Sequence, residues 1–287
     1  MTSRPYEKLY VYLLDGVASL SDEKELGSFF IGNWKEGKNS FLFFSRPSRD
    51  KVDMFLESRP ELKLLDEYEM DYDQWQGQGL ERLDIAGFSI VPFWLVNEET
   101  PKSHGTIILD PGVVFGNGLH PTTQDCLRAV RWIMESATVE SVLDLGTGTG
   151  ILAIAAAHLG ASRVLAIDLN PLCAKTAQRN VLLNGLEDVI EVREGAAQEF
   201  LRYRADLVLA NLDYGVIADL LKNEAMRDKP GFVFSGLLRT PYRELRSLLD
   251  QYGIEVVKEW DHEMTWFTVA GKGRGVGRQP QLTFAHL

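Results

Sequence analysis

The sequence predicts an α/β protein whose larger part is a doubly wound parallel sheet. From Thr122 onward, short apolar stretches typical of buried strands alternate along the chain with stretches in which the apolar residues have helical spacing. A glycine-rich turn joins one of these strands to the helix after it. Regular alternation of this kind is typical of parallel sheets whose crossover connections are helices.

Composition and charge narrow the class of protein. The chain has 287 residues, 45% of them hydrophobic and 25% charged, which is ordinary for a globular protein and leaves room for about two domains. A formal net charge of −11 disfavours direct nucleic-acid binding, because phosphate contacts need clustered cations, and it favours a basic partner. Two cysteines cannot build a disulfide framework or a multi-cysteine metal site, so we expect no metal and a reducing compartment. With no secretory signal and no membrane-spanning run, we expect a cytoplasmic protein. We also expect a monomer.

Residues 1–70 are expected to form a small α/β domain. The predicted elements are a strand over 6–14, a helix from Ser21 with Leu26, Phe29 and Phe30 on its apolar side, a strand over 40–44, a helix over 48–57 and a strand over 62–68. This β-α-β-α-β order predicts an open α/β sandwich. An acidic stretch at 66–73 is typical of a solvated face, and alternatively it attracts a basic protein.

The rest of the chain is divided by composition. Residues 71–105 are expected to be a connector rich in Gly and Pro, followed by the main domain over 106–271 and a mobile tail over 272–287. Short strands are predicted at 88–91 and 106–109. In the main domain the predicted strands lie at 141–145, 163–167, 189–192, 206–210 and 232–235, with a closing hairpin of 254–260 and 265–270.

The strongest motif is Asp144-Leu145-Gly146-Thr147-Gly148-Thr149-Gly150, at a strand-to-helix turn. Glycine lacks a Cβ and lets the backbone approach a ligand, and open α/β sheets bind ligands at the carboxyl ends of their strands. The spacing G-x-G-x-G differs from the dinucleotide pattern and favours a nucleoside without a pyrophosphate.

Two carboxylates accompany this loop. Asp168 ends the next predicted strand, where it can accept hydrogen bonds from both ribose hydroxyls, and Asp144 could face an ammonium group. A cofactor with a ribose, an ammonium group and no phosphate is S-adenosyl-L-methionine. Alternatively, the glycines only permit a tight turn, and Asp168 and Asn170 cap the helix that begins at Pro171.

Two further segments suggest the acceptor side of a site. The loop from Asp110 to Thr123 contains three glycines and two prolines, and Thr122 or Thr123 can cap the helix that follows. Within it, His120 invites a general-base hypothesis, although a loop histidine beside proline is more often structural. Asn211 follows the fourth predicted strand of the sheet. Its amide can accept from an incoming amine and donate nearby, or it can simply cap the next helix.

Together these segments resemble the PrmA family, the methyltransferases that modify ribosomal protein L11 of the large subunit. That family shows a P-G-x-x-F-G-T-G-x-H-P-T-T loop, a D-x-G-x-G-x-G loop and an N-I-L turn after the fourth strand. The resemblance covers residues from about 70 to 271. It implies a class I S-adenosylmethionine-dependent methyltransferase with a Rossmann-like, mostly parallel seven-stranded sheet and a smaller N-terminal domain for substrate recognition.

The resemblance also implies residue roles. Carried over by position, the cofactor contacts fall on Phe115, Thr123, Gly146, Gly148, Asp168 and Asn211, with Asn211 also catalytic. The implied reaction is protein N-methylation of lysine or N-terminal amines of a basic ribosomal protein. The sequence departs from the family at Asn117, Leu119, Asp213 and Tyr214, around the place where the amine would enter. The exact substrate therefore stays open, and the alternatives are another protein, RNA, a small-molecule amine, or a non-catalytic module that keeps the fold.

Overall fold

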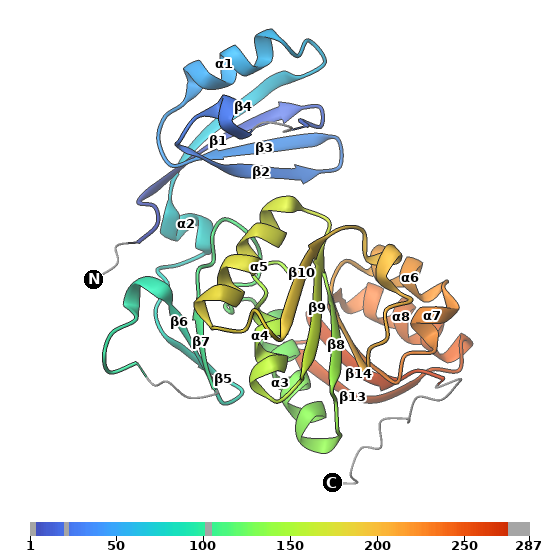
Figure 1. Ribbon diagram of the computed structural model, residues 1–287. Coiled ribbons are helices and arrows are strands. Elements are labelled where there is room, and N and C mark those ends of the chain that lie inside the picture. Colours follow the sequence, from blue (N-terminus) through green and yellow to red (C-terminus); the bar gives the residue numbers. More distant parts are fainter. Residues whose placement is uncertain (1–3, 20–22, 101–104, 275–287) are drawn as a thin grey trace. The chain divides into compact units, whose positions relative to one another are not determined.

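The computed structural model describes residues 4–19, 23–100 and 105–274, and the chain divides into two compact units (Figure 1). The first unit runs to Glu81 and the second begins at Arg82, a division that falls inside the predicted connector. The predicted domain limits themselves stay predictions, and most of the predicted tail lies outside the described residues. In the part of the chain that is described, no helix has the length and apolar character needed to cross a membrane.

The first unit is an antiparallel sheet with a helix on one face (Figure 1). Its strand order is β2-β3-β1-β4, and the strands are β1 (Lys8–Asp15), β2 (Phe30–Glu36), β3 (Asn39–Phe44) and β4 (Lys63–Asp71). Helix α1 (Arg49–Glu57) packs Val52 and Phe55 against Leu14 and Phe44, which alternate onto that face of the sheet. The short helix α2 (Tyr72–Gln76) sets the Trp75 ring edge-on to Phe43, with 5.0 Å between the ring centroids.

The order of elements in the first unit differs from the prediction. The helix expected from Ser21 is, in the described residues, only a 3-10 turn, η1 (Glu23–Leu26), followed by Gly27 at φ +82°. Phe30, expected on the apolar side of that helix, begins β2 and pairs with Phe44. The predicted β-α-β-α-β order was therefore wrong. The spacing of the apolar residues fits either element, and pairing with the aromatic strand β3 decides in favour of a strand.

The second unit is built on a seven-stranded sheet in the order β10-β9-β8-β11-β12-β14-β13. Its strands are β8 (Ser141–Leu145), β9 (Arg163–Asp168), β10 (Ile190–Glu194), β11 (Leu207–Asn211), β12 (Gly231–Leu238), β13 (Glu255–His262) and β14 (Trp266–Lys272). The first five strands run parallel, while β14 is antiparallel to both β12 and β13. The predicted doubly wound, mostly parallel sheet and its closing hairpin are confirmed.

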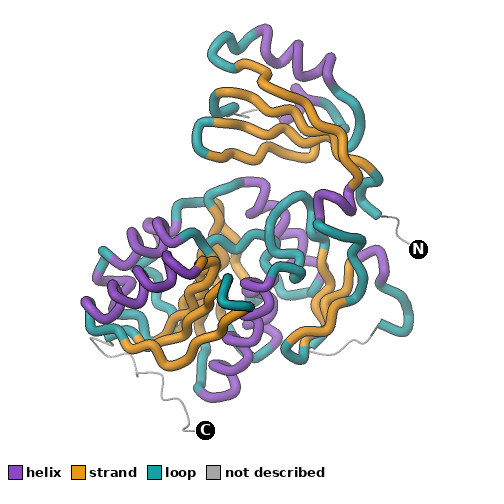
Figure 2. Tube along the Cα trace, turned by 180° about the vertical axis from the view of Figure 1, so that it is seen from behind, coloured by secondary structure: helices purple, strands orange, loops and turns teal. Residues whose placement is uncertain are grey.

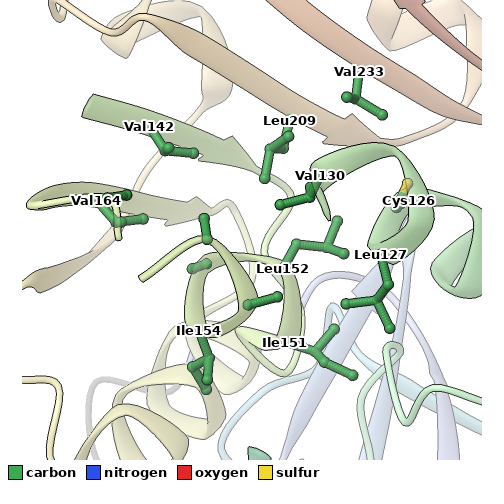
Figure 3. Packing of buried hydrophobic residues seen from close by; sticks show 14 of the residues in the cluster. Cys126, Leu127, Val130, Val142, Ile151, Leu152, Ile154, Val164, Leu209 and Val233 are labelled. Atoms are coloured by element: carbon green, nitrogen blue, oxygen red, sulfur yellow. The ribbon is translucent and has the colours of Figure 1, made fainter. Parts of the chain in front are cut away.

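Helices cover both faces of this sheet (Figures 1 and 2). One face carries α3 (Pro121–Ser136), α4 (Ile151–His158) and α5 (Pro171–Leu183), and the other carries α6 (Tyr214–Leu221), α7 (Glu224–Arg227) and α8 (Arg239–Gln251). Because side chains alternate along a strand, Val142 enters the first core and Leu143 the second. Figure 3 shows the first core, where Val130, Leu152 and Leu209 pack with Val142. Each fully buried side chain of this size contributes roughly 1.5–3 kcal/mol.

A small three-stranded sheet precedes this core. It consists of β5 (Leu83–Ile85), β6 (Phe88–Pro92) and β7 (Thr106–Leu109), with β6 and β7 parallel. The latter two match the predicted short strands. Neither β5 nor α2 was predicted, because elements of three and five residues are too short to show a recognisable periodicity. Short 3-10 turns, η2 (Phe93–Leu95) and η3 (Ala197–Phe200), complete the described elements.

Candidate functional site

The predicted motifs meet at one edge of the seven-stranded sheet. The glycine loop follows β8, Asp168 ends β9 and Asn211 ends β11, and these three strands are parallel neighbours. The chain leaves β8 toward β9 on one side and returns to β11 on the other, so this edge contains the point where the strand order reverses. Ligands of open α/β sheets bind at such a point.

The glycine loop adopts backbone conformations that residues with side chains rarely reach. Gly146, Gly148 and Gly150 have φ values of +72°, +56° and +84°. A Cβ added to Gly148 would collide with the carbonyl oxygen of Phe115, and one added to Gly146 would collide with the side chain of Leu212. The room left by these glycines is thus used by neighbouring segments of the chain, which brings those segments to the site.

Asp168 is held in place by backbone donors. The N–H groups of Gly148 and Asn170 donate to its two carboxylate oxygens at 3.0 and 2.9 Å. Burial raises the pKa of Asp168, and these two hydrogen bonds oppose the rise. A carboxylate offers about four acceptor positions, so acceptor capacity remains for a ligand. Asn170, not Asp168, caps α5, because its side chain accepts from the Leu172 N–H at 3.0 Å.

Asp144 is almost completely buried, with 1% of its surface exposed. One carboxyl oxygen accepts from the Thr147 hydroxyl at 2.6 Å, and the other has no hydrogen-bond partner among the described residues. Desolvation raises the pKa of Asp144 to about 7; the Thr147 hydroxyl opposes the rise, the nearby Asp168 adds to it, and the Ala153 N–H at the start of α4 opposes it more weakly. A cationic group placed beside the second oxygen would stabilise the ionised form.

Thr123 lies in the first turn of α3 with 1% of its surface exposed. Its hydroxyl oxygen is buried and has no partner within the described residues. A buried hydroxyl without a hydrogen bond is costly, and such atoms are candidates for contact with a ligand. Neither Thr122 nor Thr123 caps α3 as predicted. The cap is His120, whose ring accepts from the Thr122 N–H, and Pro121 occupies the first helical position.

His120, Thr122 and Asn211 form a hydrogen-bonded chain. The Thr122 N–H donates to His120 Nδ1 at 3.3 Å, which places the ring proton on Nε2. The Thr122 hydroxyl can then donate to the same Nδ1 at 2.8 Å while accepting from Asn211 Nδ2 at 3.2 Å. Burial lowers the pKa of His120 below its usual value, and the nearby His262 lowers it further. The ring is therefore neutral at pH 7. With Nδ1 occupied by these contacts, His120 serves as a helix cap.

Aromatic side chains flank His120. The rings of Phe115 and Trp266 meet it edge-on, with centroids 5.3 and 4.8 Å away, and Phe115 is 48% exposed. Trp266 was not among the site residues predicted from the sequence. Since β14 runs antiparallel to β12, however, its first residue pairs with Leu238 at the carboxyl end of β12, on the same edge as Asn211. That antiparallel hairpin was the signal that could have placed Trp266 here.

Asn211 does not cap the helix that follows it. Asp213 does so instead, because its side chain accepts from the Gly215 N–H at 2.7 Å. The capping alternative for Asn211 was therefore wrong, and its amide oxygen is directed elsewhere. Asn117, another departure from the family pattern, closes its own turn by accepting from the Leu119 N–H at 3.0 Å.

A family model described as ribosomal protein L11 methyltransferase (PrmA) matches residues 51–274. The chain belongs to the PrmA family. The resemblance given by its motifs is thereby confirmed, and the match extends into the first unit.

Relatives of this PrmA-family chain agree with that assignment. The ribosomal protein L11 methyltransferases of Desulforamulus reducens and Bacillus cereus (strain G9842) are 39% and 38% identical over 173 residues. Each alignment covers 59% of this chain and 54% of the relative, so the chain spans about half the length of the curated relatives it matches. A crystal structure of ribosomal protein L11 methylase from Lactobacillus delbrueckii subsp. bulgaricus is 28% identical with a TM-score of 0.53, covering 65% of this chain and 94% of that one. The predicted fold class is confirmed.

Proposed function

We propose that the protein transfers methyl groups from S-adenosyl-L-methionine to amines of ribosomal protein L11. The acceptors are lysine ε-amines or the N-terminal amine. Membership of the PrmA family and the names of the relatives, ribosomal protein L11 methyltransferases, support this proposal. The observation that carries it is the position of Asn211, which lies at the same sheet edge as the glycine loop and Asp168.

The residues at this edge fit the cofactor. Asp168 would accept from the ribose hydroxyls, Asp144 would face the ammonium group, and the Thr123 hydroxyl, which lacks a partner among the described residues, would gain one. The backbone of Gly146 and Gly148 would line the site, together with the exposed ring of Phe115 and the Asn211 side chain. When bound, S-adenosyl-L-methionine supplies a methyl group already activated by its sulfonium, so the protein chiefly provides positioning and a dry pocket.

Asn211 would orient the acceptor amine. Its Nδ2 donates to Thr122, which leaves Oδ1 as the group available to accept. A Cβ built on Gly236 would lie 2.7 Å from the carbonyl oxygen of Leu212 and 3.2 Å from Asn211 Oδ1, so Gly236 packs against this turn and leaves no room for a side chain. An amine that reaches Asn211 Oδ1 would donate one N–H to it, and its lone pair would point away from that oxygen.

The amine must lose a proton before it can react. A lysine has a pKa of about 10.4 in water, and desolvation beside a cationic sulfonium lowers that value. Water can then take the proton. We assign no general base, and His120 is unsuited to that role because the lone pair on its Nδ1 already accepts from Thr122.

We further propose that the first unit recognises the protein substrate. The net charge of −11 supports a basic partner and disfavours direct binding of nucleic acid, and we propose that a monomer suffices.

The test is a transfer assay with isotopically labelled S-adenosyl-L-methionine and three acceptors: purified ribosomal protein L11, ribosomal RNA and free lysine. We expect label only in the protein, and mass spectrometry should place it on amines. Label in RNA or in free lysine alone would overturn the proposed substrate. Calorimetry that detects no binding of S-adenosyl-L-methionine would overturn the whole proposal and favour a non-catalytic module.

A further inference from the structure

Two loops of the site are locked to each other through their backbones. The Thr149 N–H donates to the Phe115 carbonyl at 3.1 Å, and the Thr149 hydroxyl donates to the Gly116 carbonyl at 2.7 Å. A Cβ on Gly116 would lie 2.7 Å from that hydroxyl, so the two loops are in direct contact. The segment that carries Phe115 and the glycine loop therefore cannot move independently.

Asn180 of α5 fastens this pair of loops at a third point. Its side chain is fully buried, with 0% exposed surface. Oδ1 accepts from the Asp110 N–H at 2.7 Å, while Nδ2 donates to the carbonyls of Asp110 and Thr149 at 2.9 and 2.8 Å. One amide thus joins a helix, the start of the segment from Asp110 and the end of the glycine loop.

Asn184, one turn further along the chain, makes a similar clamp without touching the glycine loop. Its Oδ1 accepts from the Ile108 N–H at 2.9 Å, and its Nδ2 donates to the Ile108 carbonyl at 2.7 Å. Nδ2 also donates to the carbonyl of Asn180 at 2.7 Å. Both asparagines therefore hold a backbone segment by the same chemistry, and they differ in whether the glycine loop is included.

We propose that Asn180 is a positioning residue for cofactor binding, acting through the Thr149 carbonyl and the Asp110 backbone. The proposal rests on the proposed function. Arg179 of α5 also pairs with the Asp110 carboxylate, so the Asp110 segment keeps a second tie to this helix, whereas among the described residues only Asn180 donates to the Thr149 carbonyl. Without Asn180, the glycine loop, whose Gly148 N–H donates to Asp168, therefore loses its hydrogen bond to α5. Affinity for the cofactor then falls even where the protein stays folded.

The experiment compares Asn180→Ala with Asn184→Ala in the full chain. Calorimetry measures the Kd for S-adenosyl-L-methionine, and thermal unfolding without ligand measures stability. We expect Asn180→Ala to raise the Kd about tenfold, a loss typical of removing one or two hydrogen bonds. Asn184→Ala should change the Kd less than about twofold, although both variants lower the Tm, because both remove buried clamps.

A third variant, Thr149→Val, removes the hydroxyl bond to Gly116 while keeping the side-chain shape. It should raise the Kd severalfold, and it tests the same junction if Asn180→Ala fails to fold. Unchanged affinity in the Asn180 and Thr149 variants, or an equal loss in Asn184→Ala, would overturn the inference alone. A wild-type protein that binds no S-adenosyl-L-methionine would overturn the proposed function as well, so the two failures can be told apart.

Discussion

The carboxyl groups of the acidic stretch in the first unit and those at the strand ends of the second unit have opposite surroundings. In the first unit, the acidic stretch contributes exposed ion pairs: Glu67 lies 3.4 Å from Arg49, Asp73 lies 2.8 Å from Arg4, and Glu69 pairs with Lys8. In the second unit, Asp144 and Asp168 lie at strand ends, where hydroxyl or backbone groups donate to them and no described cation pairs with either.

The difference separates a solvated surface from a site prepared for a ligand. Exposed ion pairs contribute about 0–1 kcal/mol and say little about function. A buried carboxyl with an oxygen left without a described partner, such as Asp144, costs stability and is retained where a ligand needs it. The pairing of the acidic stretch favours its interpretation as a solvated face.

Asn211→Ala should produce the largest effect at the strand-end site. Without Oδ1 the amine loses its orientation, and we expect kcat to fall by about 100-fold or more. The Kd for S-adenosyl-L-methionine should change far less, which calorimetry on the same variant checks. Thr122→Val, which removes the partner of Asn211 Nδ2 together with the hydroxyl contact to His120, should reduce kcat by a smaller factor. An Asn211→Ala variant that turns over like the wild type would remove Asn211 from the mechanism.

Asp144→Asn should stabilise the ligand-free protein in a pH-dependent way. The carboxyl loses its proton near pH 7 in the folded state and near about pH 3.9 in the unfolded state, so stability falls as the pH rises between these values. The variant keeps an acceptor for Thr147 and escapes this loss. We expect it to gain up to about 3 kcal/mol more at pH 8 than at pH 5, at 1.36 kcal/mol per pH unit. Urea unfolding at both pH values measures the difference, and equal effects would place the Asp144 pKa near its ordinary value.

Cofactor affinity should depend on the same carboxyl. Since the ionised form favours an ammonium group, the wild-type Kd should rise by up to about tenfold for each pH unit below 7. Asp144→Asn should bind more weakly at pH 8 and show a flatter profile. Calorimetry between pH 6 and 8 tests this. A wild-type profile as flat as that of the variant would mean that Asp144 does not face the ammonium group.

Removing one charge from the acidic stretch should have the smallest effect. Glu67→Gln removes an exposed pair with Arg49, and we expect the free energy of unfolding to change by less than about 0.5 kcal/mol. The KM for ribosomal protein L11 should also stay the same. A severalfold increase in that KM would instead support attraction of a basic protein by this stretch. The acidic stretch would then also be a functional surface, and the contrast with the second unit would be weaker.

The sequence was most informative where one periodicity dominates. Strands such as 141–145 and 163–167 were predicted because apolar runs between glycine and proline turns leave few alternatives. The region around Phe30 failed because its apolar spacing suits a helix and a strand equally, and the choice depends on pairing with a distant strand.

At the site, the sequence predicted which segments would meet, but not which atoms would fill the space between them. The roles of Leu212 and the Phe115 carbonyl depend on how two loops approach each other, which no local pattern encodes. His120 replaced the expected threonine cap because its ring can reach the Thr122 N–H. Trp266 belongs to the site only through the direction of the closing hairpin.

The interlocked loops have a consequence for engineering. Because Thr149 and Asn180 tie the glycine loop to the segment that begins at Asp110, replacing either loop alone would leave backbone donors and acceptors without matching partners where the two loops meet. A designer who wishes to alter acceptor preference by transplanting residues 110–120 from a homologue should therefore move residues 146–150 and the asparagine of α5 along with them.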